Sequence, residues 1–465
     1  MSTLTEVKPV AGEIRESTDE QNEKRKLTES GTAAGTDDTP EAKRMRTDGS
    51  CENRESGYYF QNGLRKVYPY MFQYQVFAKG RWVGRTVLDV FSTEFRAHSK
   101  EYYEEAIKSG QIRVNGEPVD LTYRFKDNDK VTNETHRHEV PVIGCPIKII
   151  YEDKNMLVVD KPPSIPVHPC SRYRLNSMLK ILSEENGYSS LHTLHRLDRL
   201  TSGVLMFAKT KERSLFMDEL IRTRHVTKQY LCRVRGEFPD GEITVAKPIE
   251  VYSYKIGVSG VKEGGRDCTT IFEKLSFNGK SSVVLARPKQ GRMHQIRVHL
   301  QYLGHPIVRD PLYNDEAFGS NRAKGGLTEK TPEELVDELM KRHTLENWLT
   351  PMSDAELENR KATFGQANPS SDTPGSPATS SAEDFFKNYP ENLEHYITDD
   401  FRKTLRGYDP SKMQYVESCP ECQQRYIDPS PEDLTMYLHC YSYKGEDFEY
   451  TASWPNWARE DWVLD

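Results

Sequence analysis

The sequence lacks the features that mark membrane and secreted proteins. It has no run of about 18 apolar residues, so no membrane-spanning helix is expected. The N-terminus has no apolar stretch and carries Glu6 and Glu13, which disfavours a secretory signal and a mitochondrial presequence. The eight cysteines are scattered through a long chain, so a reducing compartment fits better than a disulfide framework.

Motifs for nucleotide-driven chemistry are also missing. The chain contains no G-x-x-x-x-G-K-[ST] and no G-x-G-x-x-G after a strand, so we expect no nucleotide cofactor. Zinc nucleobase deaminases need an H-x-E upstream of P-C-x-x-C, and no H-x-E occurs anywhere in the sequence. Deamination is therefore disfavoured.

The chain has few hydrophobic residues and no excess of positive charge. Hydrophobic residues make up 36% of the sequence, and the mean hydropathy of -0.76 is low for a fully globular protein. We therefore expect a globular core with disordered tails. The net charge is -7, so a nucleic-acid partner requires a local basic surface.

The first 83 residues divide into two parts. Residues 1–56 are rich in charged and small polar residues, and we expect a disordered charged tail. Two basic clusters in it, which start at Lys24 and Lys43, are either nuclear import signals or ordinary tail charge. Residues 57–83 bring the first aromatic residues and read as a lead-in segment.

Residues 84–135 predict two helices followed by a hairpin. The hairpin signal is Asn115-Gly116 between two short strands. Exposed basic residues of this unit, Arg85 and Arg113 among them, could contact a phosphate backbone. The alternative is that they only form a solvated face.

Residues 146–326 form the main body, in which strands dominate and helices interrupt them irregularly. This pattern predicts an α+β domain with a mixed, largely antiparallel sheet. The segment "MHQIRVHLQYLG" runs from an alternating pattern towards a helical one, with His294 and His299 in the alternating part.

The remaining residues predict a spacer and a small addition. Residues 327–385 return to low complexity, with "NPSSDTPGSPATSSAED" typical of a linker. Residues 386–465 regain aromatic residues and predict a small C-terminal appendage.

Two groups of residues have the composition of a metal site. His192, His195 and Asp198 are spaced three apart, but the turn that follows and the neighbouring arginines oppose a cation there. Cys419 and Cys422, with the distant pair formed by His439 and Cys440, have the ligand count of a zinc site. The alternative to this weak zinc candidate is two ordinary turns with free thiols.

The stretch "LHTLHRLDRLTSG" places Asp198 between two arginines and before a Thr-Ser-Gly turn. A surface loop tolerates this pattern, and a catalytic carboxylate that must stay ionised requires something like it. Three further segments bear on the choice, namely "VDKPPSIPVHP", "KQYLCRVRG" and "PKQGRMHQIRVHLQYLGHPIVRDPLY".

These four segments, in this order, resemble the RluA-type family of pseudouridine synthases. "HRLDRLTSG" matches the family's H-R-L-D-x-x-T-S-G motif, which places Asp198 at the catalytic position. "GRMHQIRVHL" and "GHPIVRD" match its late motif, with Arg297 at the conserved arginine, and Tyr230 matches the active-site aromatic residue. In "DKPPS", Ser164 stands where the family usually has Gly, a departure that concerns loop conformation. Residues 84–135 resemble, more weakly, the small RNA-binding module that precedes the catalytic domain in many members.

The resemblance implies an RNA isomerase without cofactor. Asp198 would act as nucleophile or base, with Arg297 keeping it ionised and Tyr230 stacking on uracil. Arg196 would enter the stack that the target base leaves. The residues expected to contact RNA are Arg196, Arg199, Arg292, Arg85 and Arg113. His195 is expected to have a structural role.

The resemblance also implies a partner. The chain most resembles a eukaryotic branch similar to fungal enzymes that modify the first uridine of the tRNA anticodon loop. We therefore expect tRNA as the partner, a monomer without membrane association, and a location in the nucleus, the cytoplasm or, less so, the mitochondrion. Two other functions stay open, a non-catalytic RNA-binding or chaperone protein and a hydrolase that pairs Asp198 with Asp160.

Overall fold

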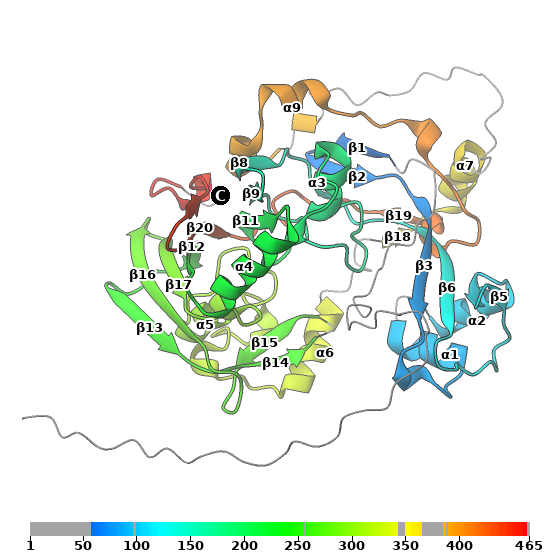
Figure 1. Cartoon of the computed structure of the whole chain (residues 1–465), viewed down its shortest axis with the longest axis horizontal. Helices are drawn as coiled ribbons and strands as arrows, with labels where there is room; N and C mark the ends of the chain where they lie inside the picture. The colour runs from blue at the N-terminus through cyan, green and yellow to red at the C-terminus, as the bar shows by residue number, and fades with distance from the viewer. Residues whose placement is uncertain are drawn as a thin grey trace, which may run out of the picture. The chain divides into compact units, whose positions relative to one another are not determined.

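The structure is a computed structural model, shown as a ribbon in Figure 1. It describes residues 57–95, 99–254, 256–342, 349–364, 385–386 and 389–462. The expected tail at residues 1–56, with its two basic clusters, lies outside the described residues, as does the whole "NPSSDTPGSPATSSAED" segment. None of the helices in the described ranges is both long and apolar enough to cross a membrane.

A ten-stranded sheet forms the centre of the main body. Eight of its strands lie side by side in the order β13 (Glu242–Ala246), β16 (Thr269–Phe277), β17 (Ser281–Pro288), β12 (Thr227–Arg235), β20 (Leu438–Lys444), β11 (Ser202–Ala208), β9 (Met156–Lys161) and β8 (Lys148–Glu152). The short strands β10 (His192–Thr193) and β21 (Glu449–Thr451) pair with β11 and β20. All neighbours are antiparallel except β11 and β20, which confirms the predicted α+β fold with a largely antiparallel sheet.

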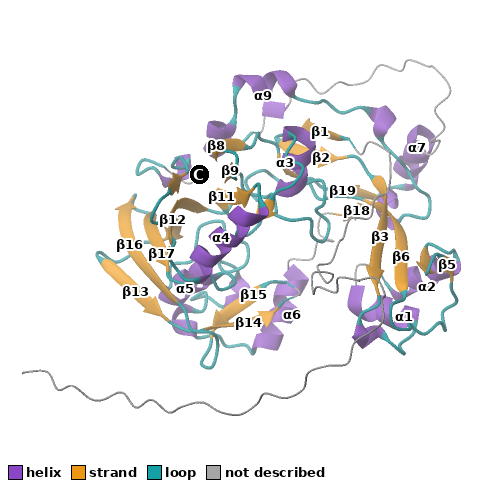
Figure 2. Ribbon diagram, viewed as in Figure 1, coloured by secondary structure: helices purple, strands orange, loops and turns teal. Residues whose placement is uncertain are grey.

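Helices cover the sheet and explain its hydrophobic strands. Every residue of β9 and β11 is buried, so both faces of these strands are covered. The helix α4 (Lys211–Arg222) packs on β11, and α5 (Gln295–Leu303) packs on β16 and β17 (Figure 2). The helix α3 (Met178–Asn186) contributes Met178, Ile181 and Leu182 to the same core as β9 and β11.

The last part of the chain is not an appendage. Its strand β20 lies in the middle of the sheet, parallel to β11 and antiparallel to β12. Gly203 of the Thr-Ser-Gly turn allows this approach, because a Cβ at its φ of +107° would lie 2.2 Å from the Cys440 carbonyl oxygen. The prediction for residues 386–465 was wrong because sequence periodicity does not show which distant strand a segment joins.

The expected linker at residues 327–385 also contains a packed helix. The helix α6 (Pro332–Arg342) buries Leu335 and Leu339 fully against the hairpin of β14 (Ile249–Ser253) and β15 (Val258–Val261). Further on, β18 (Leu349–Pro351) pairs with β19 (Gln424–Tyr426) and is followed by α7 (Asp354–Phe364). The sequence-based prediction overlooked one apolar stripe of helical spacing beside a low-complexity segment.

The small module has the predicted two helices and hairpin, and two strands more. The helices are α1 (Val87–Val90) and α2 (Lys100–Lys108), and Asn115 and Gly116 turn between β4 (Ile112–Val114) and β5 (Glu117–Pro118) with positive φ. Its sheet has the order β3 (Tyr70–Phe77), β6 (Lys130–Arg137), β4, β5. The predicted lead-in segment thus supplies β3, and before it β1 (Tyr58–Gln61) and β2 (Leu64–Val67) form a sheet with β7 (Val142–Ile143).

The expected alternating strand around His294 and His299 is the helix α5. His294 precedes it in the left-handed region, with φ of 56°, and Gly304 ends it with φ of 87°. The helix is buried on all sides from residue 295 to residue 301. Its polar residues are paired inside the protein, as when Gln295 donates to the Thr269 carbonyl, so their polarity does not mark an exposed face.

Candidate active site

Asp198 lies in the turn between β10 and β11. The backbone N–H of Thr201 donates to the Asp198 carbonyl at 3.1 Å, which closes the turn just before β11 begins. The Asp198 side chain is 31% exposed, although Leu197 and Leu200 on either side of it and every residue of β11 are buried. The carboxylate is therefore rooted in the core and still reaches the surface.

Arg297 on α5 contacts Asp198 through one nitrogen. Its Nη1 lies 3.3 Å from Asp198 Oδ2, so the predicted pair is present in the structure. The bidentate contact goes to another carboxylate, since Nε and Nη2 donate to the two oxygens of Asp310 at 2.7 and 2.8 Å. Asp310 lies in the "GHPIVRD" segment of the late motif, and no role was predicted for it from the sequence.

Asp310 holds the guanidinium of Arg297 in place. Its Oδ1 also accepts the backbone N–H groups of Leu312 and Tyr313, and its side chain is completely buried. Burial by itself raises the pKa of Asp310, but Arg297 and the two backbone donors lower it below its ordinary value. The pKa of Arg297 is raised against its own burial, chiefly by the charge of Asp310. We call Asp198, His294, Arg297 and Asp310 the Asp198 cluster.

The cluster keeps Asp198 ionised. Burial raises the pKa of this carboxyl, and the opposing charges of His294 when protonated, Arg297 and Arg196 bring the net shift below the ordinary value. At neutral pH the two arginines carry this effect, because the pKa of His294 is lowered to about 4, first by burial and then by Arg297.

The neighbours of His294 favour one tautomer. The hydroxyl of Tyr313 accepts the backbone N–H of Ser259 at 3.0 Å and lies 2.9 Å from His294 Nδ1, to which it can donate. Because the ionised carboxylate of Asp198 can only accept, the neutral tautomer that suits both neighbours carries its proton on Nε2, which lies 3.5 Å from Asp198 Oδ2. His294, left unassigned from the sequence, presents an N–H to the carboxylate.

Lys161 of the "DKPPS" segment holds the neighbouring loops together. Its buried ammonium donates to the carbonyls of Pro162, Ile165 and Arg199, the residue after Asp198. Ser164 has the φ of +70° that a glycine would favour, and its hydroxyl accepts the N–H of Ile143 at 2.8 Å. Ser164 thus adopts a backbone conformation that glycine favours, and its hydroxyl adds a hydrogen bond to Ile143.

Tyr230 and His195 lie deeper in the sheet. Tyr230 on β12 lies opposite Ala286 of β17 and Cys440 of β20 in the sheet. The pKa of its hydroxyl is raised, chiefly by burial and further by the neighbouring Cys440 and Tyr443. In the described part of the chain no hydrogen bond or ring contact joins Tyr230 to Asp198. His195 accepts the N–H of Met206 and contacts the Tyr443 hydroxyl, so it has the structural role expected of it.

The five arginines expected to contact RNA differ in how their charge is used. Arg196 is exposed beside Asp198, and Arg199 is half-buried over the ring of Tyr173, 5.4 Å from its centre. Arg292 is half-buried and donates to the Asp267 carbonyl. Of these three, Arg196 is the best placed to meet a ligand in solution.

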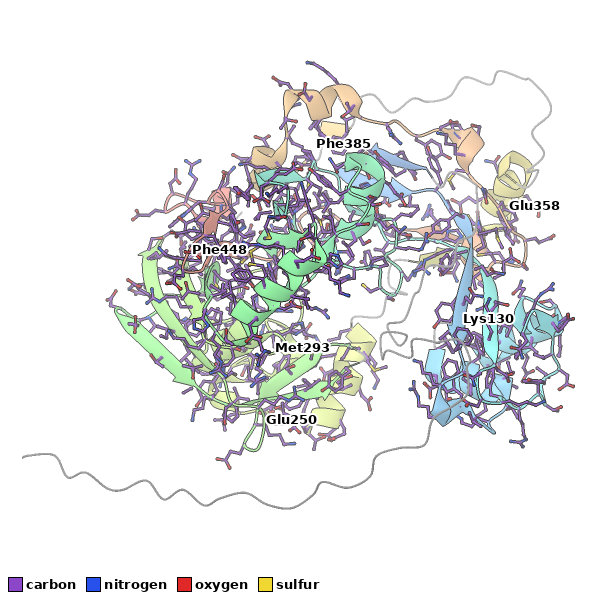
Figure 3. All side chains as sticks on the ribbon, in the orientation of Figure 1. Lys130, Glu250, Met293, Glu358, Phe385 and Phe448 are labelled. Carbon is purple, nitrogen blue, oxygen red and sulfur yellow. The ribbon has the colours of Figure 1, made fainter. Side chains whose placement is uncertain are left out.

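The two arginines of the small module differ in the same way. Arg85 is ion-paired with Asp89 and Glu94, which offsets its charge. Arg113 lines a surface hollow of about 580 Å³ together with Lys130 on β6, labelled in Figure 3. The module therefore presents Arg113 more openly than Arg85.

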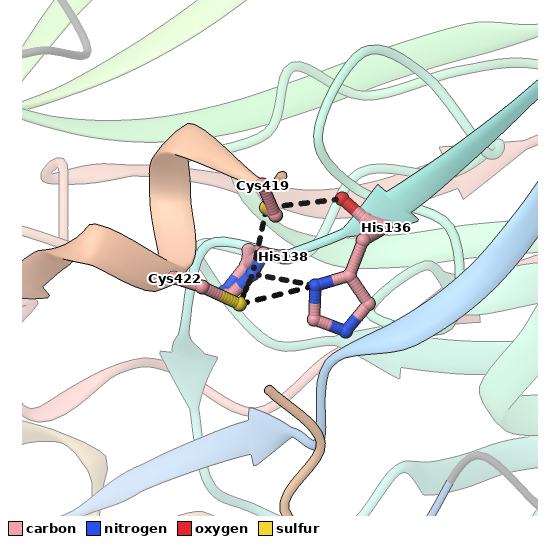
Figure 4. Close-up of side chains that lie close together, drawn as sticks. All are labelled: His136, His138, Cys419 and Cys422. Atoms are coloured by element: carbon pink, nitrogen blue, oxygen red, sulfur yellow. Dashed lines mark hydrogen bonds between the residues drawn. The ribbon is translucent and has the colours of Figure 1, made fainter. Parts of the chain in front are cut away.

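The structure does not assemble the zinc ligands that the sequence suggested. His439 lies in β20 with its Nδ1 2.9 Å from the Ser202 hydroxyl, and Cys440 follows it opposite Gly203. Cys419 and Cys422 instead face His136 and His138 (Figure 4). Two of the four predicted ligands were thus wrong, because β20 is an internal strand of the sheet.

Asp160 is not a partner of Asp198. It is completely buried in β9, where it accepts the hydroxyl proton of Tyr396 at 3.1 Å, and burial raises its pKa to about 7. A hydrolase would require the second carboxylate to reach the substrate, so the hydrolase hypothesis was wrong in this pairing.

Comparison with known proteins agrees with these features. The family model described as RNA pseudouridylate synthase matches residues 155–302, which span Asp198, Tyr230 and Arg297. The mouse protein "Pseudouridylate synthase RPUSD2" is 45% identical over 443 residues, covering 93% of this chain and 79% of its own length. Two proteins of Saccharomyces cerevisiae are similar over most of the chain. "tRNA pseudouridine(32) synthase, mitochondrial" is 36% identical and covers 85% of this chain and 77% of its own. "tRNA pseudouridine(31) synthase" is 29% identical and covers 87% and 97%.

Proposed function

This chain belongs to the RluA-type family of pseudouridine synthases, and we propose that it isomerises a uridine of the tRNA anticodon loop with Asp198 as catalytic carboxylate. As a pseudouridine synthase it is an isomerase that acts on RNA. In this reaction the N1–C1′ bond of uridine breaks and a C5–C1′ bond forms. A proton leaves C5 and one is gained at N1, so atoms and charge balance without an oxidant or a phosphate.

The observation that carries the proposal is the state of Asp198. Its carboxylate is 31% exposed and is held ionised by Arg297, which is itself fixed by Asp310. An ionised carboxylate beside C1′ can act as nucleophile or as base. The N–H of His294, 3.5 Å away, can stabilise the same oxygen as the charge on the substrate changes.

The relatives and the basic residues support the choice of substrate. Two relatives carry tRNA positions 31 and 32 in their names, which supports a substrate in the anticodon arm. A uridine in a structured loop must leave its stack to reach Asp198, at a cost of about a few kcal/mol. The exposed guanidinium of Arg196 would occupy the vacated position, and Arg113 would contact a phosphate at the small module.

Tritium release tests the substrate and the reaction together. Transcripts of one tRNA would carry C5-tritiated uridines, with uridine at position 31, at position 32, at both or at neither. We expect the full-length protein to release tritium from at least one of the first three and none from the fourth. Release from the fourth transcript would contradict the anticodon-loop site, and free uracil among the products would contradict an isomerase.

Two variants separate catalysis from binding. Asp198→Asn should bind the tRNA and release no tritium. Asp218→Asn, which changes an exposed carboxylate on α4, should behave as the unchanged protein. If Asp198→Asn still released tritium, Asp198 would not be the catalytic carboxylate.

A further inference from the structure

Four potential metal ligands from distant parts of the chain meet at the end of β6. His136 is on β6 and His138 directly follows this strand. Cys419 precedes the short helix η9 (Pro420–Gln423), and Cys422 lies in it. The histidines and cysteines are separated by 281 to 286 residues in sequence. We call these four residues the His–Cys cluster. Within the described residues it is the one cluster of three or more His, Cys, Asp or Glu ligands that could hold an ion.

We propose that the His–Cys cluster binds one structural zinc ion. In a tetrahedral site with bonds of about 2.3 Å to sulfur and 2.0–2.1 Å to nitrogen, neighbouring ligand atoms lie about 3.3–3.8 Å apart. Here His136 Nδ1 lies 3.2 Å from His138 Nε2 and 3.2 Å from Cys422 Sγ. His138 Nε2 lies 3.4 Å from Cys422 Sγ and 3.6 Å from Cys419 Sγ. Four of the six distances between the ligand atoms are therefore close to those of a zinc tetrahedron, and all six are within 4.8 Å.

The ligand types select zinc and a closed site. Two thiolates and two imidazoles are a common structural zinc set, whereas calcium and magnesium prefer oxygen. Three of the four residues are buried, with Cys419 at 7%, Cys422 at 1% and His138 at 6% exposure. Four protein ligands leave no position for water or substrate, so this ion stabilises structure and takes no part in the isomerisation.

The local sequence presents the ligands to one point. Side chains two residues apart in an extended strand lie on the same face, which brings His136 and His138 together. The Cys-x-x-Cys spacing with Pro420 after the first cysteine bends the other segment, and the N–H of Cys422 donates to the Cys419 carbonyl at 3.1 Å. Each half supplies two ligands, and the ion joins β6 to the C-terminal segment.

The residues between the ligands connect the cluster to the loop beside the active site. Arg137, between the histidines, donates to the carbonyl of Ser171. Glu421, between the cysteines, is ion-paired with Arg172 at 2.9 Å. The loop that holds Ser171 and Arg172 continues to Tyr173, whose ring lies under Arg199, the residue after Asp198. An ion bound to the His–Cys cluster therefore holds residues 171–173 in place. This loop in turn supports Arg199, the residue after Asp198.

Metal content of the full-length protein tests the proposal. Protein purified without chelator should contain about one zinc per chain by elemental mass spectrometry, and Cys422→Ser should lose it. Cys170→Ser changes an exposed cysteine outside the His–Cys cluster and should keep the zinc. Cobalt substituted for zinc should give the visible absorption of a tetrahedral thiolate site.

A ligand exchange keeps the test decisive if Cys422→Ser fails to fold. His136→Cys preserves four ligands, so this variant should keep one metal per chain and change the cobalt spectrum towards that of a three-thiolate site. Protein without zinc even after incubation with zinc sulfate would overturn the proposal. So would a disulfide between Cys419 and Cys422 in freshly purified protein, or full zinc content in Cys422→Ser. All of these measurements are independent of whether tRNA is the substrate.

Discussion

The Asp198 cluster and the His–Cys cluster place polar groups in the interior in different ways. In the Asp198 cluster every charge has a protein partner, since Arg297 lies between the buried Asp310 and the partly exposed Asp198. In the His–Cys cluster two thiols and two imidazoles face one another, and none of the four is a permanent cation that could neutralise a thiolate. The first is complete within the chain, whereas the second has the composition of a site completed by a cation.

The contacts of Arg297 distinguish a carboxylate that anchors the arginine from a carboxylate that is available for the reaction. Arg297 gives Asp310 two short hydrogen bonds and Asp198 one longer contact of 3.3 Å, so Asp310 holds the arginine and Asp198 keeps one oxygen for the substrate. No such division exists among the four ligands of the His–Cys cluster, all of which point inward (Figure 4). A reactive group and a structural group can thus be told apart by whether their partners leave a free position.

The largest effect is expected from Asp198→Asn. Removing the reacting carboxylate should lower the rate of pseudouridine formation by roughly 10³-fold or more. The free energy of unfolding should change by less than about 1 kcal/mol, since the amide still accepts from Arg297 and the site is partly exposed. Tritium release and urea unfolding measure the two quantities. A large loss of stability would show that Asp198 holds the loop instead of reacting.

Asp310→Asn should have the opposite balance. This substitution leaves the buried guanidinium of Arg297 without its main counter-charge, which typically costs about 3–5 kcal/mol. The rate should also fall, because Arg297 is then free to turn and Asp198 loses its fixed partner. The same two measurements apply. Wild-type stability in Asp310→Asn would contradict the anchoring role. It would also mean that Asp310 contributes no more to stability than Asp198 does.

The sequence predicted the parts that depend on short stretches of chain. Asp198 and Arg297 were found because each lies in a motif whose residues are neighbours in sequence, and the strands around them carry their own apolar runs. Asp310 and His294 lie in the same late motif, but a motif alone does not show which side chain holds the arginine. The fold class followed from the run of strands, whereas α5 was misread because its buried polar residues obscure the helical period.

Long-range pairing could not be predicted in this way. The strand β20 and the ligands Cys419 and Cys422 find their partners more than 200 residues earlier, at β11 and β6. The Cys-x-x-Cys pair signalled a possible zinc site. The nearest His-Cys pair in sequence, His439 and Cys440, was wrongly chosen as the other two ligands. His136 and His138 are two residues apart, a spacing that would have suggested paired ligands on a strand face.

Acid should weaken the fold through histidines that bind no metal. The pKa values of His294 and His299 are lowered to about 4, and those of His195 and His439 to about 3, in each case chiefly by burial. Because the unfolded chain binds protons that these four cannot bind when folded, stability should fall as the pH drops from 6.5 towards 4, by up to about 3 kcal/mol per histidine. Asp160, with its pKa raised to about 7, opposes this in the same window.

Urea unfolding between pH 7 and pH 5 measures this dependence. Repeating the series with a chelator separates the two clusters, because these four histidines lie outside the His–Cys cluster. We expect the chelator to lower stability at every pH and to leave most of the slope in place. A slope that vanished with the chelator would mean that zinc release, and not the buried histidines, governs the response to acid.

The smallest effect is expected from Glu421→Gln, which tests the connection between the clusters. Glu421 is not a proposed ligand, and its ion pair with Arg172 is about one-fifth exposed on each side, so the loss of stability should be about 0.5–1 kcal/mol or less. Zinc content should stay at one per chain. If the Arg172 loop supports Arg199, tRNA affinity should fall a few-fold while the rate with saturating tRNA stays unchanged. Glu417→Gln, an exposed residue before the first cysteine, is the matched control and should change neither quantity. A lower rate at saturation in Glu421→Gln would mean that the loop positions Asp198 itself, and the two clusters would then act as one unit.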